Sequence, residues 1–145
     1  MGLILNIETS TKNCSVAISD NQEIISFKEL MSDNYSHSEN LTVFIQDIIV
    51  DANINFADLS AIAVSMGPGS YTGLRIGVAT AKGLCYSLDI PLISISTLQA
   101  MAKKAAELYP EYELFCPMID ARRMEVYSAL YDRENAQKEP ISADI

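Results

Sequence analysis

Hydrophobic and polar residues follow two different periods along this chain, and together they predict an α/β fold. Apolar runs, either continuous or alternating with polar residues, are typical of strands. In the first two thirds of the chain such runs cover residues 2–8, 14–18, 23–30, 59–66 and 91–95. Apolar residues that recur every three or four positions predict helices instead. They do so over residues 37–52, 72–88 and 97–108, the first preceded by a capping box at residues 36–39.

The order of these elements indicates a meander followed by strands that are reached through helices. Short polar turns separate the first three strands, as in antiparallel hairpins. The fourth and fifth strands each follow a helix, which is typical of parallel pairing. We therefore expect residues 1–108 to form one lobe with a mixed five-stranded sheet. Strands at 114–120 and 125–131 lack partners in it, so residues 109–145 are interpreted as the start of an incomplete second lobe with a frayed polar tail from Asp132.

The composition of the 145 residues, 49% hydrophobic and 20% charged, is that of a globular protein rather than a disordered one. No apolar run approaches the roughly 20 residues of a membrane helix, and the first residues lack the basic region of a signal peptide. Three widely spaced cysteines without a Cys-x-x-Cys pair indicate reduced thiols rather than disulfides or a zinc site. We expect a cytoplasmic protein without membrane contact.

Charge is unevenly distributed. The net charge is −9, with −7 over residues 1–60, +3 over residues 61–104 and −5 over residues 105–145. So acidic a surface repels phosphate backbones, which disfavours direct binding of nucleic acid by this chain.

The helix at 72–88 has two apolar faces, although a surface helix needs only one. Gly73 and Gly77 lie on the second face and each cost about 1 kcal/mol relative to alanine, which close approach of another backbone would offset. That face either packs against the same chain or receives a partner, and two valines of the first helix would extend it. The predicted interface comprises Val43, Val50, Gly73, Ile76, Gly77, Thr80 and Leu84.

Two turns carry groups that can bind anions. A carboxylate and hydroxyls follow the first strand and can hold a metal-bound phosphate, or they form an ordinary hydrogen-bonded turn. These residues are Glu8, Thr9, Ser10 and Thr11. The glycine-rich segment 67–73 precedes a helix, whose backbone amides can hold an anion, although the segment lacks the Walker A pattern and is otherwise structural.

We expect no catalytic residue and no metal ligands in this chain. His37 is its single histidine, so a two-histidine metalloprotease helix is excluded, and no Gly-x-Ser-x-Gly elbow is present. Arg122 and Arg123 lie between two strands, where they either bind a carboxylate or phosphate or pair locally with Asp120 or Glu125.

Six motifs in order resemble the TsaB family, also called YeaZ or glycoprotease-like proteins. The most specific is Pro-Gly-Ser-Tyr-Thr-Gly-Leu-Arg at residues 68–75. The motifs occupy residues 4–10, 15–18, 37–41, 67–77, 81–84 and 119–127.

The resemblance implies an actin-like, Hsp70-like ATPase fold of two ribonuclease-H-like lobes and a part in making N6-threonylcarbamoyladenosine at position 37 of tRNA. It implies a non-catalytic subunit that dimerises with a TsaD-like catalytic subunit through the first two helices and is joined by a TsaE-like ATPase. Alone, the chain would form a homodimer through the same helices, and contact with tRNA would be indirect. ATP or ADP with magnesium is the ligand that such a fold implies near Glu8–Thr11. TsaD paralogues hold a metal through His-x-x-x-His, but Leu41 stands where the second histidine would be.

The alternative is an independent enzyme, either an ATP-dependent enzyme of the actin-like superfamily or a glycoprotease-like peptidase. It would need a nucleotide held between two lobes, or a catalytic constellation that the residues above do not supply.

Overall fold

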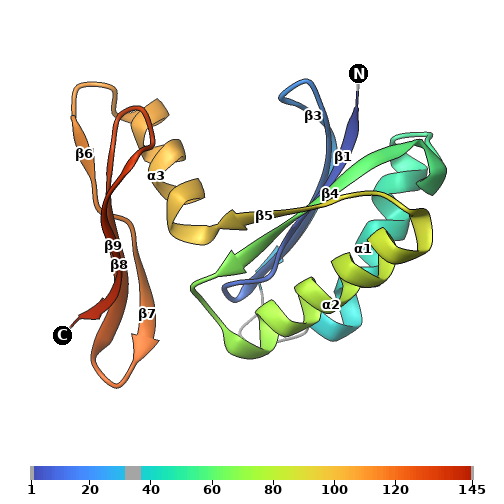
Figure 1. Ribbon diagram of the computed structural model, residues 1–145. Coiled ribbons are helices and arrows are strands. Elements are labelled where there is room, and N and C mark those ends of the chain that lie inside the picture. The colour runs from blue at the N-terminus through green and yellow to red at the C-terminus, as the bar shows by residue number, and fades with distance from the viewer. Residues whose placement is uncertain (1, 32–36, 145) are drawn as a thin grey trace. The chain divides into compact units, whose positions relative to one another are not determined.

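A computed structural model describes the backbone of residues 2–31 and 37–144 and the side chains of residues 2–31 and 40–143. The predicted capping box at residues 36–39 lies outside the described side chains. Contacts divide the chain into two compact units (Figure 1), and each unit is described by itself. The first comprises Met1–Met66 and Ser70–Ser94, and the second Gly67–Gly69 and Ile95–Ile145.

The first unit contains a mixed sheet with the strand order β3-β2-β1-β4-β5. β1 is antiparallel to β2, β2 is antiparallel to β3, and β1 is parallel to β4. The five-stranded mixed sheet predicted from the sequence is thereby confirmed. The strands are β1 (Leu3–Glu8), β2 (Asn13–Asp20), β3 (Glu23–Met31), β4 (Leu59–Gly67) and β5 (Leu92–Ser96).

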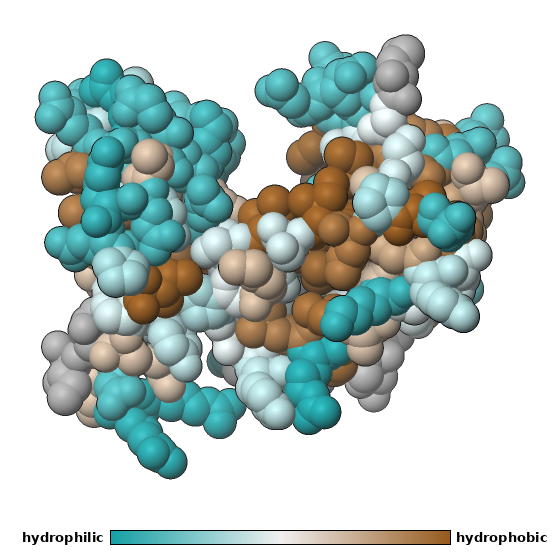
Figure 2. All heavy atoms as spheres, in the orientation of Figure 1, coloured by the Kyte–Doolittle hydropathy of each residue, from teal (hydrophilic) through white to brown (hydrophobic). Residues whose placement is uncertain are grey.

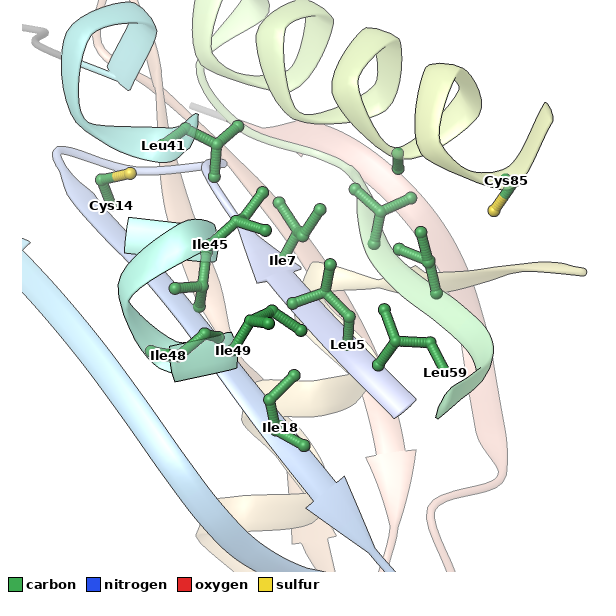
Figure 3. Close-up of a cluster of buried hydrophobic side chains, with 14 residues drawn as sticks. Leu5, Ile7, Cys14, Ile18, Leu41, Ile45, Ile48, Ile49, Leu59 and Cys85 are labelled. Carbon is green, nitrogen blue, oxygen red and sulfur yellow. The ribbon is translucent and has the colours of Figure 1, made fainter. Parts of the chain in front are cut away.

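Helices α1 (His37–Asp51) and α2 (Tyr71–Leu88) cover the same face of this sheet (Figure 1), and a short 3-10 turn at Phe56–Asp58 leads into β4. The strand register brings Leu5 opposite both Ile18 and Ile62, and none of these three side chains is exposed. Figure 3 shows side chains of α1 pointing into this layer, where they complete the core. Each fully buried aliphatic side chain contributes roughly 1.5–3 kcal/mol, so this core fixes both helices on the sheet.

β3 lies at one edge of the sheet and exposes large hydrophobic side chains. Phe27 is 62% exposed and Met31 80% exposed. Figure 2 shows hydrophobic side chains gathered over the sheet of this unit. On the helix side of the strand, the Lys28 ammonium contacts Asp47 at 2.7 Å and Asp51 at 3.6 Å. The hydrogen bond to Asp47 raises the pKa of Lys28, and it ties the edge strand to α1.

The second unit is a small antiparallel sheet covered by one helix. β8 is its central strand and pairs antiparallel with each of the other three strands. The core formed with the helix consists of Leu98, Ala102, Ala106, Phe115, Ala129 and Tyr131. The elements are α3 (Thr97–Leu108), β6 (Leu114–Phe115), β7 (Met118–Arg122), β8 (Glu125–Asp132) and β9 (Gln137–Asp144).

Two features of this unit differ from the sequence-based expectations. The prediction that the tail from Asp132 frays is wrong, because β9 pairs with β8. Most residues of β9 are polar, and its apolar Ile141 is exposed, so the sequence carries little sign of the strand. Hydrogen bonds from Lys138 and from the Ala136 backbone lower the pKa of Asp132 and anchor the turn before β9. In addition, the prediction places α3 in the first lobe, whereas the structure packs it with the second unit. Its apolar face contacts the apolar side chains of β6 and β8.

Tyr131, which is 1% exposed, provides a test of this second core. We expect Tyr131→Ala to destabilise the second unit by about 3–5 kcal/mol, because it leaves a large cavity. Tyr112→Ala is the matched control, since Tyr112 is 58% exposed and should cost less than about 0.5 kcal/mol. Amide hydrogen exchange in β8 measures both effects; similar protection in the two variants would contradict the assignment of this core.

Candidate functional site

The carboxylate at the end of β1 is held by two neighbours from the same unit. Glu8 Oε1 accepts a hydrogen bond from the Ser10 backbone N–H at 2.6 Å. The Ser65 hydroxyl, at the same end of the parallel strand β4, donates to Glu8 Oε2. Both carboxylate oxygens are therefore engaged within the chain.

The next residue joins the β1–β2 turn to helix α2. Thr9 is fully buried, and its hydroxyl donates to the carbonyl oxygen of Gly73 at 2.8 Å. One residue further, the Ser10 carbonyl accepts from the Ser70 N–H at 2.6 Å, and Ser70 is the N-cap of α2. The turn thus carries two hydrogen bonds to the first turn of this helix.

Gly77 lies one helical turn beyond Gly73 and is also buried. A Cβ on Gly77 would overlap Thr9 Oγ1, and it would lie 3.4 Å from Thr9 Cβ. The glycine is required here because the threonine side chain occupies the space that any larger residue would fill.

The predicted phosphate-binding group does not fit a metal-bound nucleotide. Glu8 and Thr9 are engaged as described, and Thr11 Oγ1 accepts from the Asn13 N–H at 3.2 Å. The Ser10 hydroxyl is buried and has no hydrogen-bond partner among the described residues, but one enclosed hydroxyl cannot hold a phosphate. In the part of the chain that the structure describes, no three His, Cys, Asp or Glu side chains are grouped as metal ligands. The hydrogen-bonded turn is the interpretation that the geometry favours.

Five of the seven predicted interface residues lie toward the chain's own core. Gly73 and Gly77 are buried beneath the β1–β2 turn. Ile76 and Leu84 are partly buried and pack against the first core, and Thr80 is also partly buried. Packing within the chain therefore accounts for this helix face, and a partner cannot touch the two glycines where they stand.

The other two predicted residues, Val43 and Val50 on α1, are 49% and 75% exposed. The predicted interface does not include the outward face of α2, which carries the cations Arg75 and Lys82. On this face a Cβ added to Gly83 would meet nothing within 4 Å, and Tyr86 is 92% exposed. The exposed residues are Arg75, Ala79, Lys82, Gly83 and Tyr86.

A shallow apolar groove runs beside the same face. The Arg75 guanidinium lies 5.2 Å from the centre of the Tyr71 ring and lengthens one wall. The groove is lined by Tyr71, Leu74, Arg75, Val78, Ala79 and Lys82. We name the outward faces of α1 and α2 the α1–α2 surface, defined by Val43, Val50, Ala79, Gly83 and Tyr86.

The remaining candidates add no reactive group. Burial raises the pKa of the Cys14 and Cys85 thiols, which keeps both protonated and unreactive. Asp120 accepts a hydrogen bond from the Arg122 backbone N–H at 2.8 Å, and Arg122 and Arg123 are exposed. The side chain of His37 lies outside the described residues.

Within the described ranges, no helix has the length and apolar character to cross a membrane.

Comparison with solved structures defines the class of fold. Component A of the (R)-2-hydroxyglutaryl-CoA dehydratase of Acidaminococcus fermentans superposes with a TM-score of 0.54 at 12% identity, which concerns the fold alone. YeaZ from Pseudomonas aeruginosa superposes with a TM-score of 0.87 at 27% identity, over 99% of this chain and 68% of that one. The α/β, actin-like ATPase fold expected from the sequence is confirmed.

Sequence comparison then gives the family. The model of the TsaD family, described as tRNA N6-adenosine threonylcarbamoyltransferase, matches residues 31–144. The tRNA threonylcarbamoyladenosine biosynthesis protein TsaB of Haemophilus influenzae is 36% identical over 136 residues, which are 94% of this chain and 56% of that protein. TsaB of Bacillus subtilis is 36% identical over 97% of this chain and 60% of its own length. The chain belongs to the TsaD family and is of the TsaB (YeaZ) type; it spans little more than half the length of these curated relatives.

The contact between Thr9 and Gly77 can be tested by a double-mutant cycle. Gly77→Ala should destabilise the chain by about 1–3 kcal/mol, because the new methyl group forces the Thr9 hydroxyl away from its buried partner. Thr9→Ala removes the overlapping oxygen, so the double variant should be more stable than the sum of the two single effects predicts. Denaturant unfolding measures all four proteins, and strictly additive effects would show that the two side chains do not compete for one space.

Proposed function

We propose that this chain is a non-catalytic partner subunit in the biosynthesis of tRNA N6-threonylcarbamoyladenosine, and that it pairs with a TsaD-like catalytic subunit. The names of its TsaB relatives support the pathway. The geometry of the β1–β2 turn supports the non-catalytic role, because the carboxylate and the Thr9 hydroxyl that an enzyme of this fold could use are engaged in internal hydrogen bonds.

The partner docks on the α1–α2 surface. The observation that carries this proposal is Gly83: within the described part of the chain, a Cβ on it would meet no atom within 4 Å. Ala79 and Tyr86 lie one turn from it on the same helix and are exposed, and α2 contacts α1, which exposes Val43 and Val50. A glycine inside an exposed helix is unfavourable by about 1 kcal/mol, and close approach of a second backbone is one way to offset that cost. The inward residues Gly73, Ile76, Gly77, Thr80 and Leu84 support this surface by seating α2 on its sheet.

The proposal has further parts: self-association follows from the same surface, indirect contact with tRNA follows from charge, and the ATPase partner follows from the family resemblance. Without its partner, the chain forms a homodimer through the α1–α2 surface, because self-association buries the exposed apolar side chains. A TsaE-like ATPase joins the complex. The net charge of −9 supports indirect rather than direct contact with tRNA. Residues 109–145, with α3, form the beginning of a second lobe.

Substitution of Gly83 tests the proposed docking surface. Gly83→Arg should abolish co-purification with the TsaD-like subunit of the same organism, because a long charged side chain then projects where the partner backbone approaches. It should leave folding intact, since the Cβ of the new residue meets no atom of the described residues within 4 Å and its neighbours Lys82 and Tyr86 are exposed.

Gly83→Ala is the matched control. It should raise the stability by about 0.5–1 kcal/mol through helix propensity, and it should weaken binding of the partner less than Gly83→Arg does, because a methyl group obstructs the partner backbone less than a long charged side chain. Val50→Lys tests the same surface from α1. Wild-type co-purification by both Gly83→Arg and Val50→Lys would exclude the surface.

Titration calorimetry with ATP and magnesium separates this function from that of an independent ATP-dependent enzyme. We expect no heat of binding at nucleotide concentrations of about 1 mM, which corresponds to less than about 4 kcal/mol of binding free energy. The reason is that Glu8 and Thr9 would have to give up their internal hydrogen bonds. Micromolar binding with release of phosphate would support the enzyme instead.

A further inference from the structure

Helix α2 meets the rest of its unit through a stripe of small side chains. Gly73, Gly77, Ala81 and Cys85 are its buried residues, and they recur every four positions along the inward side. Such a stripe allows close approach to the sheet, and Ile76, Val78, Leu84 and Leu88 beside it pack against the core. Small residues along the line of closest contact constrain the position of the helix along its own axis less than large interlocking side chains do.

Hydrogen bonds near its two ends also tie the helix to the rest of the unit. At the C-terminal end, the Cys85 thiol donates to the Pro91 carbonyl at 3.5 Å. At the N-terminal end, the β1–β2 turn provides the Thr9 bond to Gly73 and the Ser10 bond to Ser70. Thr9 acts through its side chain, and it also fills the space left by Gly77.

The residues held by Thr9 and the α2 part of the α1–α2 surface lie on different sides of the same helix. Gly73 and Gly77 are buried, while Ala79 and Gly83, which follow Gly77 within two turns, are exposed. A shift of the first two turns along or around the helix axis therefore moves the outward residues by a comparable amount. In a packed interface such displacements reduce complementarity.

We propose that Thr9 is a positioning residue for partner binding: its hydroxyl holds α2 in the place that makes the α1–α2 surface complementary to the catalytic subunit. The inference rests on the proposed function. It assigns to the β1–β2 turn a role in recognition, although the turn itself lies beneath the helix and does not touch the partner.

The experiment compares Thr9→Val with Thr9→Ser. Valine keeps the volume and branching of threonine but cannot donate to Gly73, whereas serine keeps the hydroxyl. For Thr9→Val we expect the Kd for the TsaD-like subunit to rise about 5- to 10-fold, the effect of about one lost hydrogen bond. Thr9→Ser should restore binding to within about twofold of wild type. Equal affinity of all three proteins would overturn the proposal.

A control variant separates positioning from general stability. Ile18 is fully buried in the same unit and makes no hydrogen bond through its side chain. Ile18→Val should therefore lower the stability by about 0.5–1.5 kcal/mol without removing a hydrogen bond that positions α2. We expect its Kd to match that of wild type at a temperature well below unfolding. If Ile18→Val weakens binding as much as Thr9→Val does, Thr9 acts only through stability and the proposal is wrong.

A second measurement does not depend on the partner. Amide hydrogen exchange at Leu74 and Gly77 should become about tenfold faster in Thr9→Val than in wild type, while exchange at Cys85 stays unchanged. If the wild-type chain does not bind the catalytic subunit at all, the proposed function fails, but the exchange result still shows whether Thr9 holds the helix. Unchanged exchange at Leu74 would remove the positioning role, whatever the partner does.

Discussion

The hydrogen bond from the Thr9 hydroxyl to the Gly73 carbonyl is the contact on which the arrangement of this unit depends. It is buried, so breaking it leaves a carbonyl lone pair in a dry environment, which is more costly than losing a bond to water. It also explains why Gly77 has no side chain, since the threonine occupies that space. The β1–β2 turn has the composition of a phosphate-binding turn, but here its polar groups bind helix α2.

The strands and helices of the first unit could be predicted from the sequence, because the alternation and helical periodicity of hydrophobic residues follow which side chains are buried. Leu5, Val16 and Ile62 each stand at a position whose neighbours face the other way, and each is buried. The sequence did not distinguish the side of α2 that is buried against the chain from the side that is exposed. Glycine carries no hydropathy signal that distinguishes a buried close contact, as at Gly77, from an open surface, as at Gly83.

The same limit explains the other differences. Most side chains of β9 are polar, and even its largest apolar side chain, Ile141, is 40% exposed, so its pairing with β8 is what shows that it is a strand. Helix α3 has one apolar stripe that would suit either sheet, and its contact with Phe115 and Tyr131 is decided by residues distant in sequence. For the candidate site, the sequence placed Glu8, Thr9 and Ser10 in the turn after the first strand. It could not show that the Thr9 hydroxyl and the Ser10 carbonyl bind helix α2, or that the Glu8 carboxylate accepts hydrogen bonds from Ser10 and Ser65.

The exposed edge strand β3 has a consequence for the behaviour of the chain in solution. An uncovered row of apolar side chains favours association between copies, and long-range repulsion between like-charged molecules opposes it. With a sequence pI near 4.4, the repulsion is strong at neutral pH and weakens as carboxylates are protonated. Added salt screens it over distances of about 10 Å at 0.1 M. The resistance of the free chain to self-association therefore depends on electrostatic repulsion. It is greatest at neutral pH and low ionic strength, and smallest at mildly acidic pH and high salt concentration.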